Sequence, residues 1–409
     1  MGDINKRKKL AKESCNFGIS DLPDDMLEQI VSFLSLNEAV RTCVLSKNWS
    51  YIWKFVPTLR ISDTADKCNS LIEIFLRGRG NTAITVCDIE LTNLEKVEMH
   101  DMIDTWIFHI VNLCHVQELR VISCVEDDFL QFRDQALISK HLKRLELDKV
   151  RLKASTVDFS SCPALEEIDL MFCWIEENYI ISKSLKRLIA VECEFDSVGA
   201  RTHISVPNLI FLKLTDIWHY TPLFEAMPSL EVGYVSLGED CLDYCNNNKS
   251  CGCDNVDCGF GCTDGYKYDS ILLEGLSNAS YLELLSEPSM FIFYRDLRRC
   301  PTFRNLRTLI LNEWFLVANL HGLARVLRNS PILEELNLLL LEEPKEVVES
   351  NGDHYQVEHP LLMETLKEVK VNCERQYMWV QEIINILITF GISPEIIIVK
   401  ESQMHPDVI

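Results

Sequence analysis

Cysteines carry the strongest chemical signal in this sequence. Residues 239–269 contain seven acidic residues, two lysines and six cysteines, at positions 241, 245, 251, 253, 258 and 262. Cysteine thiolates two to four residues apart are typical ligands of structural zinc. Two pairs have three intervening residues each, Cys241 with Cys245 and Cys258 with Cys262. Because acidic, leucine-poor segments more often form loops that bind nothing, we expect no cofactor, with zinc at these four cysteines as the alternative.

No arrangement of residues in the sequence predicts catalysis. The ten histidines are scattered without the HExxH pattern of a metalloprotease helix, and His354 and His359 flank Glu358 in a polar stretch. Residues 77–80, RGRG, are too few and wrongly spaced for a glycine-rich loop that binds phosphate. We therefore expect a non-catalytic protein.

The charge of the chain limits its partners. Its 409 residues include 62 acidic and 40 basic residues, a formal net charge of −22, although residues 1–60 hold nine basic against seven acidic residues. A strongly acidic body repels phosphate backbones and anionic lipid surfaces. We therefore expect neither nucleic acid nor membrane as a partner.

Targeting signals are few. No apolar run reaches the roughly 18 residues that a membrane span needs, and residues 1–17 lack the apolar stretch of a secretory signal. We expect an intracellular protein, in the nucleus, the cytoplasm or both, with its 17 cysteines as reduced thiols. Residues 6–9, KRKK, are interpreted as a solvated basic tail, with a nuclear import signal as the alternative.

Three helix starts are concentrated in residues 21–57. Pro23 among three aspartates favours a first helical turn, and it precedes Leu27, Ile30, Val31 and Leu34 at helical spacing. Ser35 and Glu38 have the spacing of a capping box, which predicts a second helix, and Ser46 is expected to cap a third. Such a small unit rarely hides this much apolar surface by itself, so the rest of the chain or a partner must cover it.

This stretch resembles an F-box, the module that docks onto a Skp-family adaptor in cullin-based ubiquitin ligases. Order and spacing agree over residues 18–60, at Leu22, Pro23, Leu27, Ile30, Leu34, Val40, Ser46, Trp49 and Trp53. The resemblance implies that the Leu-Pro start and the exposed helical faces bind the adaptor, and through it a cullin. The implied adaptor-binding residues are Leu22, Pro23, Leu27, Ile30, Leu34, Val40, Leu45, Trp49 and Trp53.

Beyond residue 60, a pattern of Leu, two residues, Leu, one residue and Leu keeps returning. Its clearest copies begin at Leu142, Leu165, Leu185, Leu209, Leu306, Leu333 and Leu366, and the first four are 23, 20 and 24 residues apart. The pattern resembles an irregular leucine-rich repeat. Because each short strand can bury its apolar residues only by stacking on its neighbours, we expect a parallel sheet with a continuous core.

The residues between the repeated leucines predict an outward surface. One column of this surface contains Glu118, Arg144, Glu167, Arg187 and Phe211. Because neighbouring strands lie about 4.8 Å apart, we expect these charges mainly to pair with one another, each pair contributing about 0.2–1 kcal/mol. The alternative is a target-binding surface, with Arg144, Glu167, Arg187, Ile189 and Phe211 as its candidate residues.

Two further segments complete the predicted architecture. Residues 100–113 have the spacing of a core helix that joins the F-box region to the repeats. Near the C-terminus a strand, an amphipathic helix stopped by Gly391 and a strand at 395–399 form a unit that can cover the last open edge of the array. This unit resembles the FBD region that follows leucine-rich repeats in plant F-box proteins.

The expected fold class is therefore α/β, with an N-terminal three-helix F-box, an irregular leucine-rich-repeat solenoid and a C-terminal strand–helix–strand cap. The predicted domains are a basic tail at 1–17, the F-box at 18–60, the repeats at 61–350 and an FBD-like cap at 351–409. The cysteine-rich insertion at 239–269 interrupts the repeat pattern, and whether the array is continuous or bent there stays open.

The resemblance implies a substrate-recognition subunit of a cullin-type (SCF) ubiquitin ligase, in which the repeats bind a target protein. A separate conjugating enzyme would supply the chemistry, and this chain would contribute proximity. Two alternatives remain. One is a small-molecule-dependent receptor, and the other is a binding scaffold outside any ligase, with a metal-binding cysteine loop.

Overall fold

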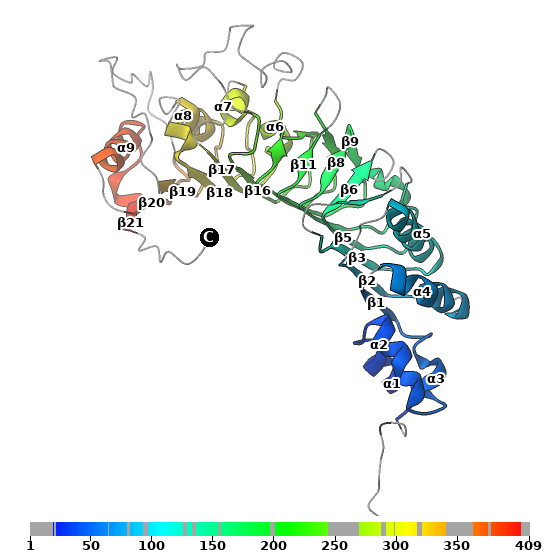
Figure 1. Ribbon diagram of the computed structural model, residues 1–409. Helices are drawn as coiled ribbons and strands as arrows, with labels where there is room; N and C mark the ends of the chain where they lie inside the picture. Colours follow the sequence, from blue (N-terminus) through cyan, green and yellow to red (C-terminus); the bar gives the residue numbers. More distant parts are fainter. Residues whose placement is uncertain are drawn as a thin grey trace, which may run out of the picture. The chain divides into compact units, whose positions relative to one another are not determined.

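A computed structural model describes residue 19 and residues 22–63, 65–79, 82–92, 97–125, 129–132, 136–153, 157–196, 201–243, 270–287, 292–297, 299–316, 321–340, 363–374 and 378–401 (Figure 1). The chain divides into two compact units, Met1–Val125 and Glu126–Ile409. The fold is mixed α/β and starts with a helical region, as the sequence predicts. The unit boundary differs from the predicted domains, because the first three strands fall in the unit of the F-box helices. The basic tail predicted at 1–17 lies outside the described residues.

The first two helices of the chain begin at or next to their predicted starts. α1 (Asp24–Val31) starts directly after Pro23, with two aspartates in its first turn. α2 (Leu36–Arg41) has the predicted capping box. The Glu38 N–H donates to Ser35 Oγ over 3.4 Å, and the Ser35 N–H donates to the Glu38 carboxylate over 3.0 Å. The 3-10 turn η2 (Thr42–Val44) and the short helix α3 (Trp49–Ile52) follow.

Ser46 does not cap α3, so this prediction was wrong. An N-cap residue must directly precede the first helical residue, and that position is held by Asn48, whose side chain makes no capping hydrogen bond. Ser46 Oγ is instead buried, without a hydrogen-bond partner among the described residues. The third helix of the F-box is therefore shorter and starts later than its sequence suggests.

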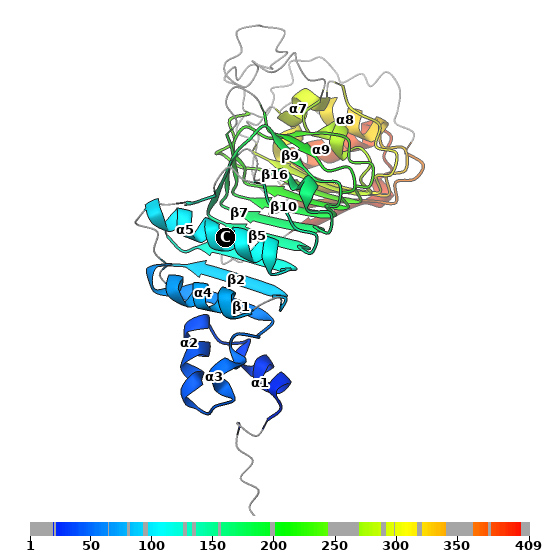
Figure 2. The same cartoon turned by 90° about the vertical axis from the view of Figure 1, so that its right-hand side faces the viewer.

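A layer of strands and helices completes the first unit. β1 (Thr58–Asp63), β2 (Val86–Leu91) and β3 (Glu118–Ser123) pair in parallel in that order. α4 (Ala65–Arg79) and α5 (Val97–Leu113) connect them and lie along one side of these strands (Figure 2). α5 contains the helix predicted at 100–113, and its buried Trp106 donates an indole hydrogen bond to Asn69.

α4 covers part of the apolar surface of the F-box helices. The ring centres of Trp53 and Phe75 lie 6.2 Å apart. The buried guanidinium of Arg79 donates to the carbonyl of Lys54 over 3.1 Å and to that of Thr82 over 2.7 Å. Burial lowers the pKa of Arg79 to about 10, which leaves it charged at neutral pH. Part of the excess apolar surface that the sequence shows in these helices is therefore buried by α4 of the same chain.

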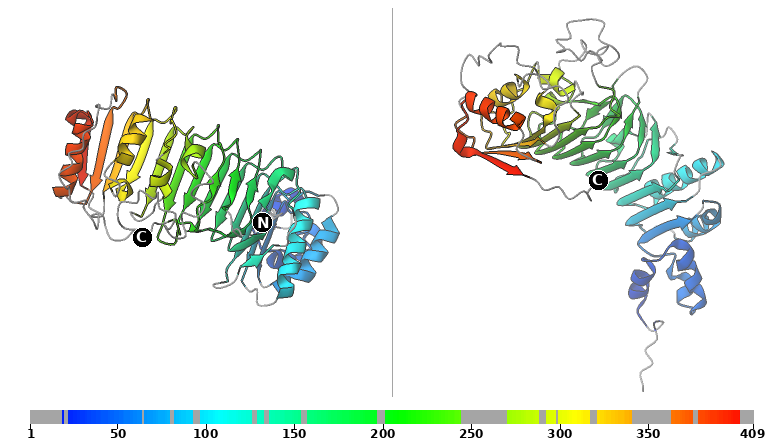
Figure 3. Two further views of the ribbon diagram at one scale, coloured as in Figure 1. Left: turned by 90° about the horizontal axis from the view of Figure 1, so that it is seen from above. Right: turned by 60° about the vertical axis from the view of Figure 1, so that its left-hand side comes forward.

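Parallel strands stacked in sequence order form the body of the second unit (Figure 3). They are β5 (Arg144–Asp148), β7 (Glu167–Met171), β10 (Arg187–Val191), β13 (Phe211–Thr215), β16 (Val232–Leu237), β17 (Tyr281–Ser286), β18 (Thr308–Asn312), β19 (Glu335–Leu340), β20 (Glu368–Cys373) and β21 (Ile397–Glu401). The apolar residues of the repeated pattern point into the core, and Leu145, Ile168, Leu188 and Leu212 are all buried. Short parallel strands with one buried face are therefore present, as the spacing predicts.

A second layer covers one face of this sheet. Two ladders of short strands belong to it. One is β14 (Trp218–His219), β11 (Glu194–Phe195), β8 (Trp174–Glu176), β6 (Val150–Lys153) and β4 (Leu130–Gln131), and the other is β15 (Leu223–Phe224), β12 (His203–Ser205) and β9 (Tyr179–Ile181).

Short helices continue this layer toward the C-terminus (Figure 1). They are α6 (Leu273–Leu276), α7 (Ile292–Leu297), α8 (His321–Arg328) and α9 (Met378–Thr389), with the 3-10 turns η4 (Phe159–Ser161) and η6 (Glu313–Leu316) among the strands. No helix in the described part of the chain has the length and apolar composition needed to cross a membrane.

The cysteine-rich insertion does not interrupt the stack of strands. β16 and β17 pair in parallel from Val232 with Tyr281 to Leu237 with Ser286. Residues 244–269, which lie outside the described residues, separate these strands only in the sequence. The question that the sequence left open is therefore answered, because the array is continuous at the insertion.

Two buried carboxylates hold the ends of this insertion. Asp243, at its start, accepts two hydrogen bonds from the Arg201 guanidinium over 2.9 and 2.5 Å, and two from the N–H and hydroxyl of Thr221 over 2.8 and 2.6 Å. Asp296 of α7 accepts hydrogen bonds over 2.7 to 3.0 Å from the backbone N–H groups of Ile271, Leu272 and Leu273. The chain thus leaves and re-enters the core at two fixed points.

Gly275 in α6 has no room for a side chain. A Cβ there would lie 2.5 Å from Phe224 Cβ and 2.9 Å from the Glu225 carbonyl oxygen. Gly275→Ala should therefore lower the free energy of unfolding by about 1–3 kcal/mol, although alanine favours helix more than glycine does. Urea unfolding measures this, with Gly238→Ala as control, since a Cβ there would meet only the Asp216 carboxylate, at 3.2 Å. An unchanged midpoint for Gly275→Ala would contradict the close approach.

A strand–helix–strand unit ends the described chain. β20 leads to α9, the chain turns at Gly391 with a φ of 95°, and β21 pairs in parallel with β20 as the last strand of the order. The predicted final strand starts too early, at residue 395. Residues 394–396 instead form the 3-10 turn η7 (Pro394–Ile396), which Ser393 Oγ caps by accepting the Glu395 N–H over 3.4 Å.

Candidate functional site

Large apolar side chains remain exposed along one side of α1. Met26, Ile30 and Phe33 follow at intervals of four and three residues, which places them on one side of the helix and its C-terminal extension. All three are exposed, Phe33 to 78%, whereas Leu27 and Val31 of the same helix are buried. α1 therefore has two apolar sides, and only one of them belongs to the core.

Two further exposed apolar residues lie at the end of η2. Val44 is 88% exposed and the adjacent Leu45 is 55% exposed. Exposed apolar residues at this density are typical of surfaces that bind another protein. We name Met26, Ile30, Phe33, Val44 and Leu45 the F-box surface.

The nine predicted adaptor-binding residues differ widely in exposure. The exposed ones are Pro23, Ile30 and Leu45, the half-buried ones are Leu22, Leu34 and Val40, and the buried ones are Leu27, Trp49 and Trp53. Side chains in the buried group are at most 5% exposed and offer almost no surface to a partner. In the free chain these three side chains belong to the core, and their expected contact with an adaptor stays a prediction.

The outward charge column is present in the strand register, but its closest ion pairs run diagonally to a residue of the next column. Arg144 faces Glu167, which in turn faces Arg187. Arg144 nevertheless lies closer to Asp169 in the next column, at 2.8 Å, than to Glu167, at 3.6 Å, and Arg187 lies 3.8 Å from Asp169. Burial raises the pKa of Asp169, and the two arginines oppose this rise. Charge pairing across strands thus occurs as favoured from the sequence, with Asp169 at its centre.

Removing Arg144 should destabilise the protein more at neutral than at acidic pH. Burial holds the pKa of Asp169 in the folded protein above its value in the unfolded chain. The protonated carboxyl group therefore favours the folded state at low pH, and this contribution to the free energy of unfolding is lost as the pH rises through the folded-state pKa. Arg144 offsets part of that loss only while Asp169 is ionised. Arg144→Ala should therefore cost about 1 kcal/mol at pH 7 and less at pH 4, near the unfolded pKa of an aspartate.

Urea unfolding at the two pH values measures this difference. Lys186→Ala serves as the control, because Lys186 and its partner Glu166 are both half exposed, and should cost little at either pH. A greater cost of Arg144→Ala at pH 4 than at pH 7 would contradict the assignment to Asp169.

Beside these ion pairs, the outward face of the sheet contains a shallow hollow with a volume of about 580 Å³. It is lined by Arg187, Ile189, Phe211, Lys213, Thr215, Tyr234, Val235, Ser236, Glu283 and Leu285, from β10, β13, β16 and β17. We call it the sheet-face hollow. It includes Arg187, Ile189 and Phe211 of the predicted target-binding set, and it does not include Arg144 or Glu167.

Phe211 and Tyr234 line this hollow with their rings, and the run of aromatic rings continues beyond it to Tyr281. The Arg187 guanidinium lies 4.4 Å from the Phe211 ring centre. The ring centres of Phe211 and Tyr234 are 5.6 Å apart, and those of Tyr234 and Tyr281 are 5.3 Å apart. The Tyr281 hydroxyl donates to Glu283 over 3.2 Å, and burial together with the charge of Glu283 raises the pKa of Tyr281. Tyr281 therefore stays protonated at neutral pH.

One of the four cysteines considered for zinc lies within the described residues. Cys241 is buried, its thiol lies 3.8 Å from the Asp243 carboxylate, and burial, reinforced by Asp243, raises the pKa of the thiol to about 12. Metal ligation needs the thiolate, so this environment suits a packed, neutral thiol better. Cys245, Cys258 and Cys262 lie outside the described residues.

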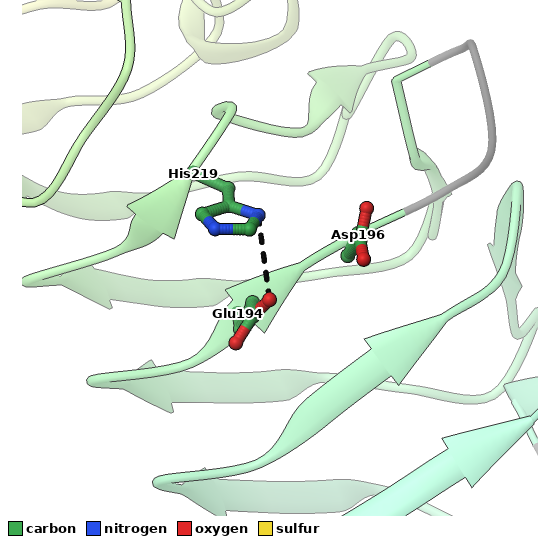
Figure 4. Close-up of side chains that lie close together, drawn as sticks. All are labelled: Glu194, Asp196 and His219. Atoms are coloured by element: carbon green, nitrogen blue, oxygen red, sulfur yellow. Dashed lines mark ion pairs between the residues drawn. The ribbon is translucent and has the colours of Figure 1, made fainter.

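Figure 4 shows a cluster that the sequence did not predict, formed by Glu194, Asp196 and His219. Their ligand atoms lie within 4.8 Å of one another, and His219 Nδ1 is 3.3 Å from Glu194 Oε1. Burial raises the pKa of Glu194, with His219 opposing that rise. No fourth candidate ligand joins them in the part of the chain that the structure describes, whereas structural zinc sites have four. The contact between His219 and Glu194 is therefore sufficient to explain why these side chains lie together.

Comparison with known proteins identifies the helical start of the chain. The family model of the F-box domain matches residues 19–60, which span α1, α2, η2 and α3. The chain therefore carries an F-box domain followed by stacked parallel strands.

Similar proteins from Arabidopsis thaliana extend this likeness along the chain. A putative FBD-associated F-box protein is 25% identical over 57% of this chain and 61% of its own length. A putative F-box/LRR-repeat protein is 27% identical over 86% of this chain and 78% of its own length. A putative F-box/FBD/LRR-repeat protein is 47% identical over 13% of this chain and 14% of its own length.

These relatives confirm the resemblance to plant F-box proteins with leucine-rich repeats and an FBD region. The chain spans 61%, 57% and 50% of the lengths of three of them, an FBD-associated F-box protein, a putative F-box protein and an F-box/LRR-repeat protein.

Proposed function

We propose that this chain is the substrate-recognition subunit of a cullin-type (SCF) ubiquitin ligase. Residues 19–60 bind a Skp-family adaptor, which connects the chain to a cullin, and the outward sheet face of the second unit binds the target protein. The observation that carries the proposal is the F-box surface, a set of exposed apolar residues within a domain that matches the F-box model.

The stacked strands are, in this proposal, an array of leucine-rich repeats. Their buried leucines, parallel register and continuity from β5 to β20 support this assignment, as does the LRR-repeat name of similar proteins. An array of this kind presents a long row of outward side chains, which suits the binding of another protein. β20, α9 and β21 would form its FBD-like C-terminal cap.

The proposed subunit performs no chemistry of its own. It places a bound target near a conjugating enzyme, so that proximity accelerates the transfer. We propose that it acts inside the cell, in the nucleus, the cytoplasm or both, and that it needs no metal or other cofactor.

Co-purification tests the proposal directly. The full chain should form a stable complex with a recombinant Skp-family adaptor, and this complex should recruit a cullin, as judged by size-exclusion chromatography. A folded chain that binds no adaptor would overturn the proposal and favour a binding scaffold outside any ligase.

A further inference from the structure

Lys213 stands in the middle of the sheet-face hollow, and no acidic residue within the described part of the chain forms an ion pair with it. In the strand register it lies between Ile189 and Tyr234, and along β13 its neighbours on the same face are Phe211 and Thr215. All four of these side chains are uncharged. Lys213 forms no ion pair with any residue that the structure describes.

The other charges of the hollow already have partners. Arg187 lies over the Phe211 ring and points toward Asp169, and Glu283 accepts the hydrogen bond of the Tyr281 hydroxyl. Lys213 is therefore the positive charge of the hollow that an incoming anionic group can neutralise. It is half-buried, and a partly desolvated ammonium gains more from a nearby anion than a fully hydrated one does.

We propose that the sheet-face hollow binds an extended segment of the target protein that presents a carboxylate to Lys213 and a neighbouring large apolar side chain to Phe211 and Tyr234. The inference rests on the proposed function, in which this sheet face binds the target. It adds the chemical class of the bound segment, which is an acidic residue beside an apolar one.

The shape and charge of the hollow favour a peptide over other anions. The hollow is shallow and lies on one face of four strands, whereas pockets for small ligands enclose most of the ligand surface. Nucleic acids need several phosphate contacts, and a chain with a net charge of −22 repels such polyanions. Phosphopeptide sites generally use clusters of arginine, while a single lysine matches a single carboxylate.

Selection from a library of random peptides tests the inference with the full chain bound to its adaptor. Selected peptides should be enriched in Asp or Glu next to Phe, Trp, Tyr, Leu or Ile. The dissociation constant of the best peptide, measured by fluorescence anisotropy, should rise at least tenfold for Lys213→Met. Exchange of the peptide Asp for Asn should have the same effect, and the two changes together should weaken binding little more than either one alone.

Lys186→Met is the matched control, because it removes the same charge beside β10 but outside the hollow. It should leave peptide binding unchanged, and both variants should keep the wild-type melting temperature. Peptides without an acidic residue, no selected peptide at all, or full binding by Lys213→Met would overturn the inference. Adaptor binding is recorded separately, because its loss in the wild-type chain overturns the proposed function, whereas failure of peptide binding alone overturns only this inference.

Discussion

Asp243→Ala should lower the free energy of unfolding of the second unit by about 3–5 kcal/mol, because it removes the carboxylate that faces a buried guanidinium. Arg201 and Asp243 are 2% and 3% exposed, so water cannot replace the lost charge. The same carboxylate also accepts the N–H and hydroxyl of Thr221, and both donors would lose this acceptor. Because domains are typically stable by about 5–15 kcal/mol, the loss should be plain in urea unfolding.

Two comparisons isolate the cause of this loss. Glu166→Ala removes a carboxylate whose ion pair with Lys186 is half exposed, and should cost less than about 1 kcal/mol. The double variant Arg201→Met with Asp243→Ala should cost less than the sum of the two single changes, since it leaves neither charge buried alone. If Asp243→Ala unfolds like the wild type, the buried ion pair does not hold the start of the insertion.

Val44→Asp combined with Leu45→Asp should weaken binding to a Skp-family adaptor at least 100-fold, roughly 2.7 kcal/mol. Docking would force the new carboxylates into an apolar interface without partners, which is costly. Both positions are largely exposed in the free chain, so the melting temperature should change little. Isothermal titration calorimetry with purified adaptor measures the affinity, and a thermal melt confirms the fold.

Ile74→Asp is the control for this surface. Ile74 is an exposed apolar residue in the same unit, but it lies on α4, outside the F-box domain. It should retain wild-type affinity, which would show that the loss depends on place and not on an added charge. Adaptor affinity preserved in the Val44/Leu45 variant would remove the F-box surface from the proposed interface.

Local rules predicted the F-box helices well where a motif spans consecutive turns. The Ser35–Glu38 capping box was confirmed because both partners lie within one helical turn and need no distant contact. The prediction that Ser46 caps the third helix failed because a serine before an apolar run resembles an N-cap in composition alone. The packing around α3 instead buries the Ser46 hydroxyl and starts the helix later. Local rules also could not predict which side chains are buried. Trp49 and Phe33 are both large and apolar, yet Trp49 is buried and Phe33 is exposed.

The strand pattern was found where a leucine opens it and apolar side chains fill the next two core positions, as in Leu165, Ile168 and Leu170. β16 escaped because Gly233 replaces the second leucine of the pattern, between Leu230 and Val235. The reason is a close approach, since a Cβ at Gly233 would lie 2.9 Å from Leu282. A search that tolerates small residues would have found β16, and likewise β17, where Ala279 precedes Leu282 at the same spacing.

The sheet-face hollow was only half visible in the sequence for the same reason. Arg187, Ile189 and Phe211 come from strands that the leucines marked, whereas Tyr234 and Glu283 come from β16 and β17. The long insertion between these two strands concealed their adjacency. Register across such a separation follows from the folded sheet and cannot be read from spacing.

The hydrogen bonds that hold Asp243 and Ile271, on either side of residues 244–269, make this span a natural site for an insertion. β16 and β17 pair with each other although this span separates them in the sequence, and doubling the length of a connecting segment adds only about 0.6 kcal/mol of closure entropy. A fluorescent reporter or affinity tag inserted there would leave both chain termini untouched. It could follow the intact protein through assembly and turnover in living cells.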